Sequence, residues 1–140
     1  MILTEIDIID AFYGYVSSKE LVRKIGGGFY RTPRPINSSN EDMVISVLAT
    51  GSGQIQPFVL NVNIYVPDIK RGKEFILDER RMSVLMREAL KVFEHGKFVY
   101  PLDGKDYDIL FDLESQKIYE VNGANSHAVN HKINVSVCTE

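Results

Sequence analysis

Two histidines and a cysteine near the end of the chain are the side chains most suited to binding a metal ion. They are His127, His131 and Cys138, in the segment NSHAVNHKINVSVCTE. The segment alternates apolar and polar residues, which predicts a β-strand. Four residues of a strand span about 13 Å, whereas a zinc–nitrogen bond is about 2 Å long. Cys138 falls on the opposite face from His131, so we predict no metal site. One face of this strand carries Val129, His131, Ile133, Val135 and Val137.

Acidic side chains in the last third of the chain could hold a divalent metal ion for hydrolysis. In metal-dependent nucleases such a cluster is followed by Glu-x-Lys, because the lysine stabilises or activates the nucleophile. Here Glu120 is followed by Val and Asn, and the lysine is missing. We therefore interpret these acids as the solvated face of a half-buried sheet. They are Asp106, Asp108, Asp112, Glu114 and Glu120.

Other sequence features also lack the surroundings that catalysis requires. Gly26–Gly28 follows a short predicted helix rather than a strand, and no Gly-Lys-Ser/Thr follows it, so we expect a helix end and a hinge. Ser17, Ser18, Ser38 and Ser39 lie in no G-x-S-x-G sequence. Cys138 is poorly placed for a buried nucleophile. The sequence thus predicts no catalytic, cofactor-binding or metal-ligating residue, no cofactor and no enzymatic activity.

Composition and charge limit the classes of function that the chain can have. The chain has 140 residues, of which 44% are hydrophobic and 25% charged, as expected for one globular domain over residues 1–140. A net charge of −3 argues against specific nucleic-acid recognition, although two basic stretches, 31–34 and 70–81, leave room for a local basic patch. The single cysteine favours a reduced, cytosolic setting. The opening MILTEIDIIDAFYGYV carries three acids, so we expect neither a signal peptide nor a membrane partner.

Hydrophobic periodicity predicts two main helices. The first has Thr4 as its N-cap and runs to about Val16. A short helix should follow, opened by a capping box at Ser17–Glu20 and ended by the glycine triplet. The second main helix covers about residues 78–95, and Gly96 ends it.

Alternating residues predict the strands. Met43, Ile45, Val47 and Ala49 share one face of a strand that turns at 50–53 and returns over 58–66. A meander should follow, with strands at 107–111 and 118–121, turns at Leu113–Gln116 and 122–125, and a last strand from about His127. The order α, β, β, α, β, β, β favours an α+β fold. It has an antiparallel sheet, made of the long hairpin and the C-terminal meander, with two main helices on one face.

Two polar segments without predicted regular structure link these elements. Phe29–Asp42 reads as an exposed loop with a short strand at Phe29–Arg31, and Asp68–Glu74 reads as a charged linker. The stretches TPRPINSSNED and VPDIKRGKEF, which cover most of the first segment and all of the second, are long enough to act as arms that carry assembly contacts. Mobile loops without function are the equally weighted alternative.

The order of the segments carries a resemblance to a known family. An amphipathic N-terminal helix leads to FYRTPRP, then to the hairpin MVISVLATGSGQIQPFVLNVNIYVPD, the helix LMREALKVFE and the final strand HKINVSVCTE. This resembles, in topology and segment character over most of the chain, the tail-terminator and tail-completion (head–tail joining) proteins of long-tailed phages and prophages. The resemblance implies a non-enzymatic structural subunit. It would form a homo-oligomeric ring, usually a hexamer, that terminates the tail tube and joins it to the head.

The same resemblance implies other phage tail or neck proteins as partners. It also implies assembly in the cytoplasm of the host and a final place in the virion. Two alternatives stay open beside it. One is a small metal-dependent, nuclease-like α+β enzyme that uses the clustered Asp and Glu residues of the C-terminal strands. The other is a chaperone or adaptor that binds a partner strand along an exposed sheet edge.

Overall fold

The computed structural model describes residues 2–31 and 33–139 and shows the α+β fold that the sequence predicts. Its helices in this part of the chain are α1 (Glu5–Ser17), α2 (Glu20–Lys24) and α3 (Glu79–Phe93). Its strands there are β1 (Phe29–Tyr30), β2 (Met43–Thr50), β3 (Gln56–Pro67), β4 (Ile69–Arg71), β5 (Glu74–Ile76), β6 (His95–Leu102), β7 (Lys105–Val121) and β8 (Ser126–Thr139).

One large sheet holds most of these strands, in the order β1-β2-β3-β8-β7-β6, while β4 pairs only with β5. The long hairpin β2–β3 lies beside the last strand, because β3 pairs with β8 from Gln56↔Val137 to Pro67↔Ser126. All neighbours run antiparallel except β1, which runs parallel to β2. The expectation of an antiparallel sheet is therefore confirmed apart from this two-residue edge strand. β1 enters from the glycine triplet, and a loop brings the chain back to β2 in the same direction.

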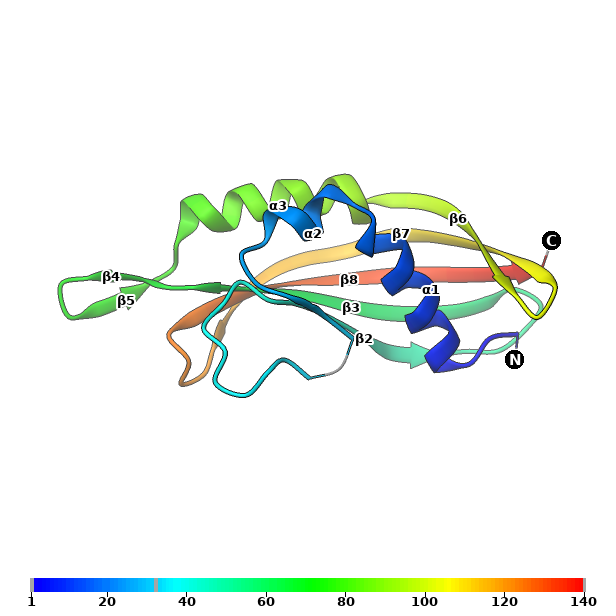
Figure 1. Ribbon diagram of the computed structural model, residues 1–140, viewed down its shortest axis with the longest axis horizontal. Helices are drawn as coiled ribbons and strands as arrows, with labels where there is room; N and C mark the ends of the chain where they lie inside the picture. Colours follow the sequence, from blue (N-terminus) through cyan, green and yellow to red (C-terminus); the bar gives the residue numbers. More distant parts are fainter. Residues whose placement is uncertain (1, 32, 140) are drawn as a thin grey trace.

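The helices lie on one face of the sheet, where α1 lies obliquely across the strands, α3 runs roughly along them, and α2 lies between the two (Figure 1). Alternate residues of β3 and β8, among them Leu60 and Ile133, point into this layer and are fully buried against Phe12 of α1 and Phe93 of α3. Each such burial contributes about 1.5–3 kcal/mol. None of the helices in the described residues has the length and apolar character needed to cross a bilayer.

Capping explains where the helices begin. The Thr4 side chain accepts a hydrogen bond from the Asp7 N–H, and the Asp7 carboxylate accepts one from the Thr4 N–H, so the predicted N-cap of α1 is confirmed. The capping box expected at Ser17–Glu20 is wrong. The hydroxyls of Ser17 and Ser18 donate instead to backbone carbonyls of the last turns of α1, and α2 begins without a side-chain cap.

Two β-bulges account for other differences from the sequence prediction. The pairing of β7 with β8 shifts between Leu113 and Ser115, so the turn expected at Leu113–Gln116 is a bulge within one continuous strand. In β2 a shift between Val47 and Ala49 turns Ala49 away from the helices, contrary to the predicted alternation. The predicted strands at 107–111 and 118–121 are thus one strand, and the third strand of the meander is β6, which sequence reasoning had left unassigned.

The charged linker predicted at Asp68–Glu74 is a second, separate hairpin. β4 and β5 pair from Ile69↔Ile76 to Arg71↔Glu74, and Gly72 begins the two-residue turn with a φ of 63°. Glycine adopts this left-handed conformation without strain. The hairpin projects from one end of the elongated molecule, whereas the two termini and the β6–β7 turn lie at the other end (Figure 1).

Candidate functional site

The two histidines of the last strand have separate partners rather than a shared metal. His127 lies 2.6 Å, measured from Nδ1, from Oδ1 of Asp68, at the start of the projecting hairpin. His131 is fully buried under α3, with its ring 5.4 Å from that of Phe93. Cys138 pairs with Asp108 across the strands and faces away from the helices. Within residues 2–31 and 33–139, no three His, Cys, Asp or Glu side chains are grouped so that they could hold a metal ion.

His131 forms part of a hydrogen-bonded link between the sheet and α3. Its Nδ1 lies 3.1 Å from the carbonyl oxygen of Val62, which only accepts, so Nδ1 carries the proton. Nε2 therefore accepts from the Gln116 side chain at 2.9 Å, and Gln116 also donates to the carbonyl of Met86 in α3 at 3.0 Å. Burial lowers the pKa of His131 to about 4, against a smaller opposing effect of the bond to Val62.

The acidic residues of the meander do not converge either. Asp108 and Asp112 lie on the uncovered face of β7, where Asp108 is 3.8 Å from Nζ of Lys97 and Asp112 accepts from Asn134. Glu114 occupies the bulge and binds Lys132 at 3.0 Å. Because the bulge adds one residue, Glu120 has the opposite orientation and pairs with His127 on the helix side. The carboxylates of the nuclease alternative thus lie on two faces, spread along the strand.

The glycine triplet binds carboxylates of its own chain. The N–H of Gly26 donates to the Glu41 side chain at 2.8 Å, and that of Gly28 donates to the Asp42 side chain at 3.1 Å. The N–H of Gly27 donates to the Glu41 carbonyl at 3.0 Å. A Cβ on Gly27 would lie 2.7 Å from this carbonyl, so only glycine fits. The three donors that a phosphate would need are occupied, and the triplet serves to hold the end of the loop.

Ion pairs hold the same loop from two sides. Asp42 is fully buried and accepts from Arg34 at 2.8 Å and from Ser38. Burial acts to raise the pKa of Asp42, but the hydrogen bonds from Ser38, Arg34 and Gly28 outweigh it and leave the pKa below its ordinary value. Arg81 of α3 binds both carboxylate oxygens of Glu41, at 2.7 and 2.8 Å, and lowers the pKa of Glu41.

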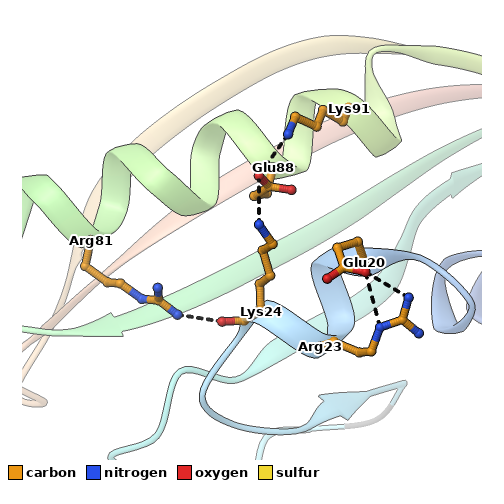
Figure 2. Close-up of polar contacts among 6 residues, drawn as sticks. All are labelled: Glu20, Arg23, Lys24, Arg81, Glu88 and Lys91. Carbon is orange, nitrogen blue, oxygen red and sulfur yellow. Dashed lines mark hydrogen bonds and ion pairs between the residues drawn. The ribbon is translucent and has the colours of Figure 1, made fainter.

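Charged side chains also join α2 to α3 (Figure 2). Lys24 and Lys91 approach the Glu88 carboxylate to 3.4 and 3.0 Å, and Arg81 donates to the backbone carbonyl of Lys24 at 2.5 Å. The hydrogen bond from Lys91, followed by that from Lys24, lowers the pKa of Glu88. Arg31 forms an ion pair with Asp10 of α1. Most arginines of the two basic stretches therefore form ion pairs with acidic side chains of the same chain.

Apolar side chains are exposed at several projecting positions. Ile36, at the tip of the loop, is 92% exposed, and Ile69 and Phe75 of the β4–β5 hairpin are 46% and 47% exposed. The hairpin carries Lys70 and Lys73 as well, and neither has an ion-pair partner among the described residues. Exposed apolar residues that gather on a projecting element are typical of interaction surfaces.

A groove of about 400 Å³ runs between α3 and the end of β7. Its walls are largely apolar, and Gln116 at its base already uses both amide hydrogens on Met86 and His131. The groove can therefore receive an apolar side chain, but its described lining presents no acid–base pair suited to catalysis. The lining includes Leu77, Met82, Met86, Leu90 and Ile118.

Acids gather at the other end of the molecule, around Tyr100 of β6. Burial raises the pKa of Tyr100, and the negative charges of Asp10, Asp7 and Asp103 raise it further, while Arg31 acts in the opposite direction. Asp7 and Asp10 belong to α1 and Asp103 to the β6–β7 turn, so negative charge comes from two elements at this end. Ile6, next to Asp7 on α1, is 62% exposed.

The sequence predicted which segments carry exposed or buried functional candidates, but not the secondary structure that each segment adopts. Sequence reasoning named VPDIKRGKEF as an arm, which stays a prediction. It also placed His131 on the apolar face of the last strand, and this placement is confirmed. It missed the β4–β5 pairing, although Ile69, Gly72 and Ile76 carry a two-residue hairpin signal. It also missed the acids around Tyr100, since no local pattern links residues 7, 10 and 103.

The sequence was also compared with known proteins. Neither the models of known protein families nor the curated protein sequences give a match to this chain.

Proposed function

We propose that this chain is a non-enzymatic structural subunit of a phage or prophage tail or neck. It assembles into a ring, of which a hexamer is the expected form, that terminates the tail tube and joins it to the head. The order of segments supports the proposal through its resemblance to the tail-terminator and tail-completion proteins. The partners are copies of the same chain and other tail or neck proteins.

One structural observation carries most weight for an assembly role. The β4–β5 hairpin projects from the end of the molecule and exposes Ile69 and Phe75, yet it makes no extensive contact with another described helix or strand. An isolated two-stranded hairpin is marginal in water unless something packs on it. A projecting element of this kind gains order and buries apolar surface when a partner covers it.

A ring requires that each subunit present two different surfaces, one to each neighbour. Two of the exposed apolar sites suit this requirement, because the β4–β5 hairpin and the first turn of α1, which carries Ile6, lie towards opposite ends of the long axis. The carboxylates of the enzymatic alternative lie on two faces of the sheet and supply no comparable support.

Size-exclusion chromatography with light scattering, over protein concentrations from micromolar to near millimolar, tests the proposal. We expect a discrete oligomer, and rings in electron micrographs of that fraction. Genes for capsid, portal or tape-measure proteins beside the coding gene would add independent support. A chain that stays monomeric throughout this range, in a genome without such neighbours, would contradict the proposed function.

A further inference from the structure

We propose that the β4–β5 hairpin of one copy docks head to tail on the acidic end of a second copy of this chain. We call this hairpin (residues 69–76) the arm. The acidic end is the surface formed by Ile6, Asp7 and Asp10 of α1, Tyr100 of β6 and Asp103. This inference rests on the proposed function and specifies the subunit contact within the ring.

The arm has the composition of one half of an interface. It exposes two apolar side chains, Ile69 and Phe75, on its two faces, because Ile69 pairs with Ile76 and Phe75 with Lys70. Three of its residues are basic and one, Glu74, is acidic; Glu74 binds Arg71 at 3.2 Å. Lys70 and Lys73 remain without an ion-pair partner in the described part of the chain. The free charge of the arm is thus positive and lies beside apolar surface.

The acidic end has the complementary composition. Asp7 and Asp10 lie one helical turn apart on α1, and Asp103 lies in the β6–β7 turn, so this end carries negative charge. Arg31 offsets part of that charge through its ion pair with Asp10. The exposed Ile6 adds apolar surface next to these acids. The arm therefore offers positive charge beside Phe75. The acidic end offers negative charge beside Ile6 and Tyr100. Such complementarity speeds encounter and fixes register.

The location of the two surfaces determines the kind of assembly. The arm lies at one end of the long axis, and the N-terminus with the β6–β7 turn lies at the other (Figure 1). Arm and acidic end of one molecule therefore point in opposite directions and cannot satisfy each other. A contact between two such different surfaces is heterologous, and it closes into a ring when the rotation between subunits allows it.

A charge-swap experiment tests this pairing. The arm variant is Lys70→Glu with Lys73→Glu, which leaves the Arg71–Glu74 pair in place. The acidic-end variant is Asp10→Lys with Asp103→Asn. Asn is used because residue 103 has a φ of 52°, which asparagine tolerates. Asp7 is left unchanged because it caps α1.

Association is measured by light scattering in 50 mM NaCl. We expect each variant alone to lose at least about tenfold in association constant, since like charges then face each other. An equimolar mixture of the two should recover association to within about threefold of the unmodified protein, because every contact again joins opposite charges. Raising NaCl to 0.5 M should weaken assembly of the unmodified protein. Arg87→Glu with Lys117→Glu, at two exposed positions of α3 and β7, is the control of equal charge and should assemble normally.

The outcomes separate the inference from the function on which it rests. If the unmodified protein and both charge variants form the same oligomer, the inference is wrong and the ring proposal stands. Failure of the mixture to recover, or an equal loss in the control, would also overturn the arm pairing. A monomeric unmodified protein at every concentration would overturn the proposed function and this inference together.

Discussion

Replacing His131 with leucine should remove a pH dependence of stability that the buried imidazole imposes. His131 is fully buried, holds its proton on Nδ1 and accepts from Gln116 at Nε2, so it has no room for a second proton. Its pKa falls to about 4 from an ordinary 6.5. Between these values the unfolded chain binds a proton that the folded chain does not. Stability is therefore complete above about pH 6.5 and is lost as the pH falls toward 4.

The gap between the two pKa values sets the size of the effect. At about 1.4 kcal/mol for each pH unit, the full loss is about 3 kcal/mol, and about 2 kcal/mol of it falls between pH 7 and pH 5. At pH 7 the leucine variant leaves the Val62 carbonyl and the Gln116 amide short of a partner, which costs about 2 kcal/mol. The advantage of the unmodified protein at pH 7 should therefore shrink to near zero at pH 5.

Urea denaturation followed by circular dichroism at pH 7, 6 and 5 measures these differences. The other titrating groups are present in both proteins, so they largely cancel in the comparison. Ile133→Val, two residues along the same buried face, is the matched control and should cost about 1 kcal/mol equally at every pH. If the free-energy difference between the unmodified protein and His131→Leu is the same at pH 7 and pH 5, the buried neutral histidine is refuted.

Three further experiments probe how the segments are held. Gly27→Ala should destabilise the fold by about 2 kcal/mol, because its Cβ would lie 2.7 Å from the Glu41 backbone, whereas Gly14→Ala, with nothing within 4 Å, should stabilise α1 by about 0.5–1 kcal/mol; thermal melts distinguish the two signs. Gln56→Leu should cost about 3 kcal/mol, since Gln56 bonds Ile2, Leu3 and Gly51, and increased hydrogen exchange at the N-terminal residues should accompany the loss. A double-mutant cycle of Arg81→Met and Glu41→Gln should give a coupling of about 1–2 kcal/mol at pH 7. Because the pKa of Glu41 is lowered in the folded state, this coupling should begin to fall as the pH drops below 4.5 and should vanish below the lowered pKa, and a coupling that does not decline below pH 4.5 would contradict the ion pair.

Local patterns predicted the parts of the fold whose causes are local. The alternation from Val129 to Val137 gave both the last strand and its buried face, and Thr4 with Asp7 gave the start of α1. The stripe from Met82 to Phe93 gave α3. In each case a short segment contains the physical reason for its own conformation, either a periodicity of two or 3.6 residues or a capping side chain.

Bulges and pairings depend on residues far apart in the chain, so local patterns did not predict them. The bulge at Glu114 is defined only by the partner strand β8, and it reverses the orientation of every later residue of β7, including Glu120. The segment Leu113–Gln116 was therefore interpreted as a turn. β6 was missed because the helical prediction was carried on to Gly96, although Phe98, Tyr100 and Leu102 alternate beside it. Gly96 is needed because the Phe111 ring packs against it.

The placement of polar and apolar side chains connects these observations to assembly. The buried polar residues Gln56, Asp42 and His131 each bind a segment outside the sheet, namely the N-terminus, the 31–42 loop and, through Gln116, α3. Segments that are already ordered lose little conformational entropy when a partner binds them. The loop thereby presents Ile36, which is 92% exposed, from a fixed position. A fold that uses buried hydrogen bonds to hold such a loop, while it leaves apolar side chains at its projecting tips, is organised for contact with other chains. We therefore expect neighbouring subunits at the tips rather than a ligand at the centre of the sheet.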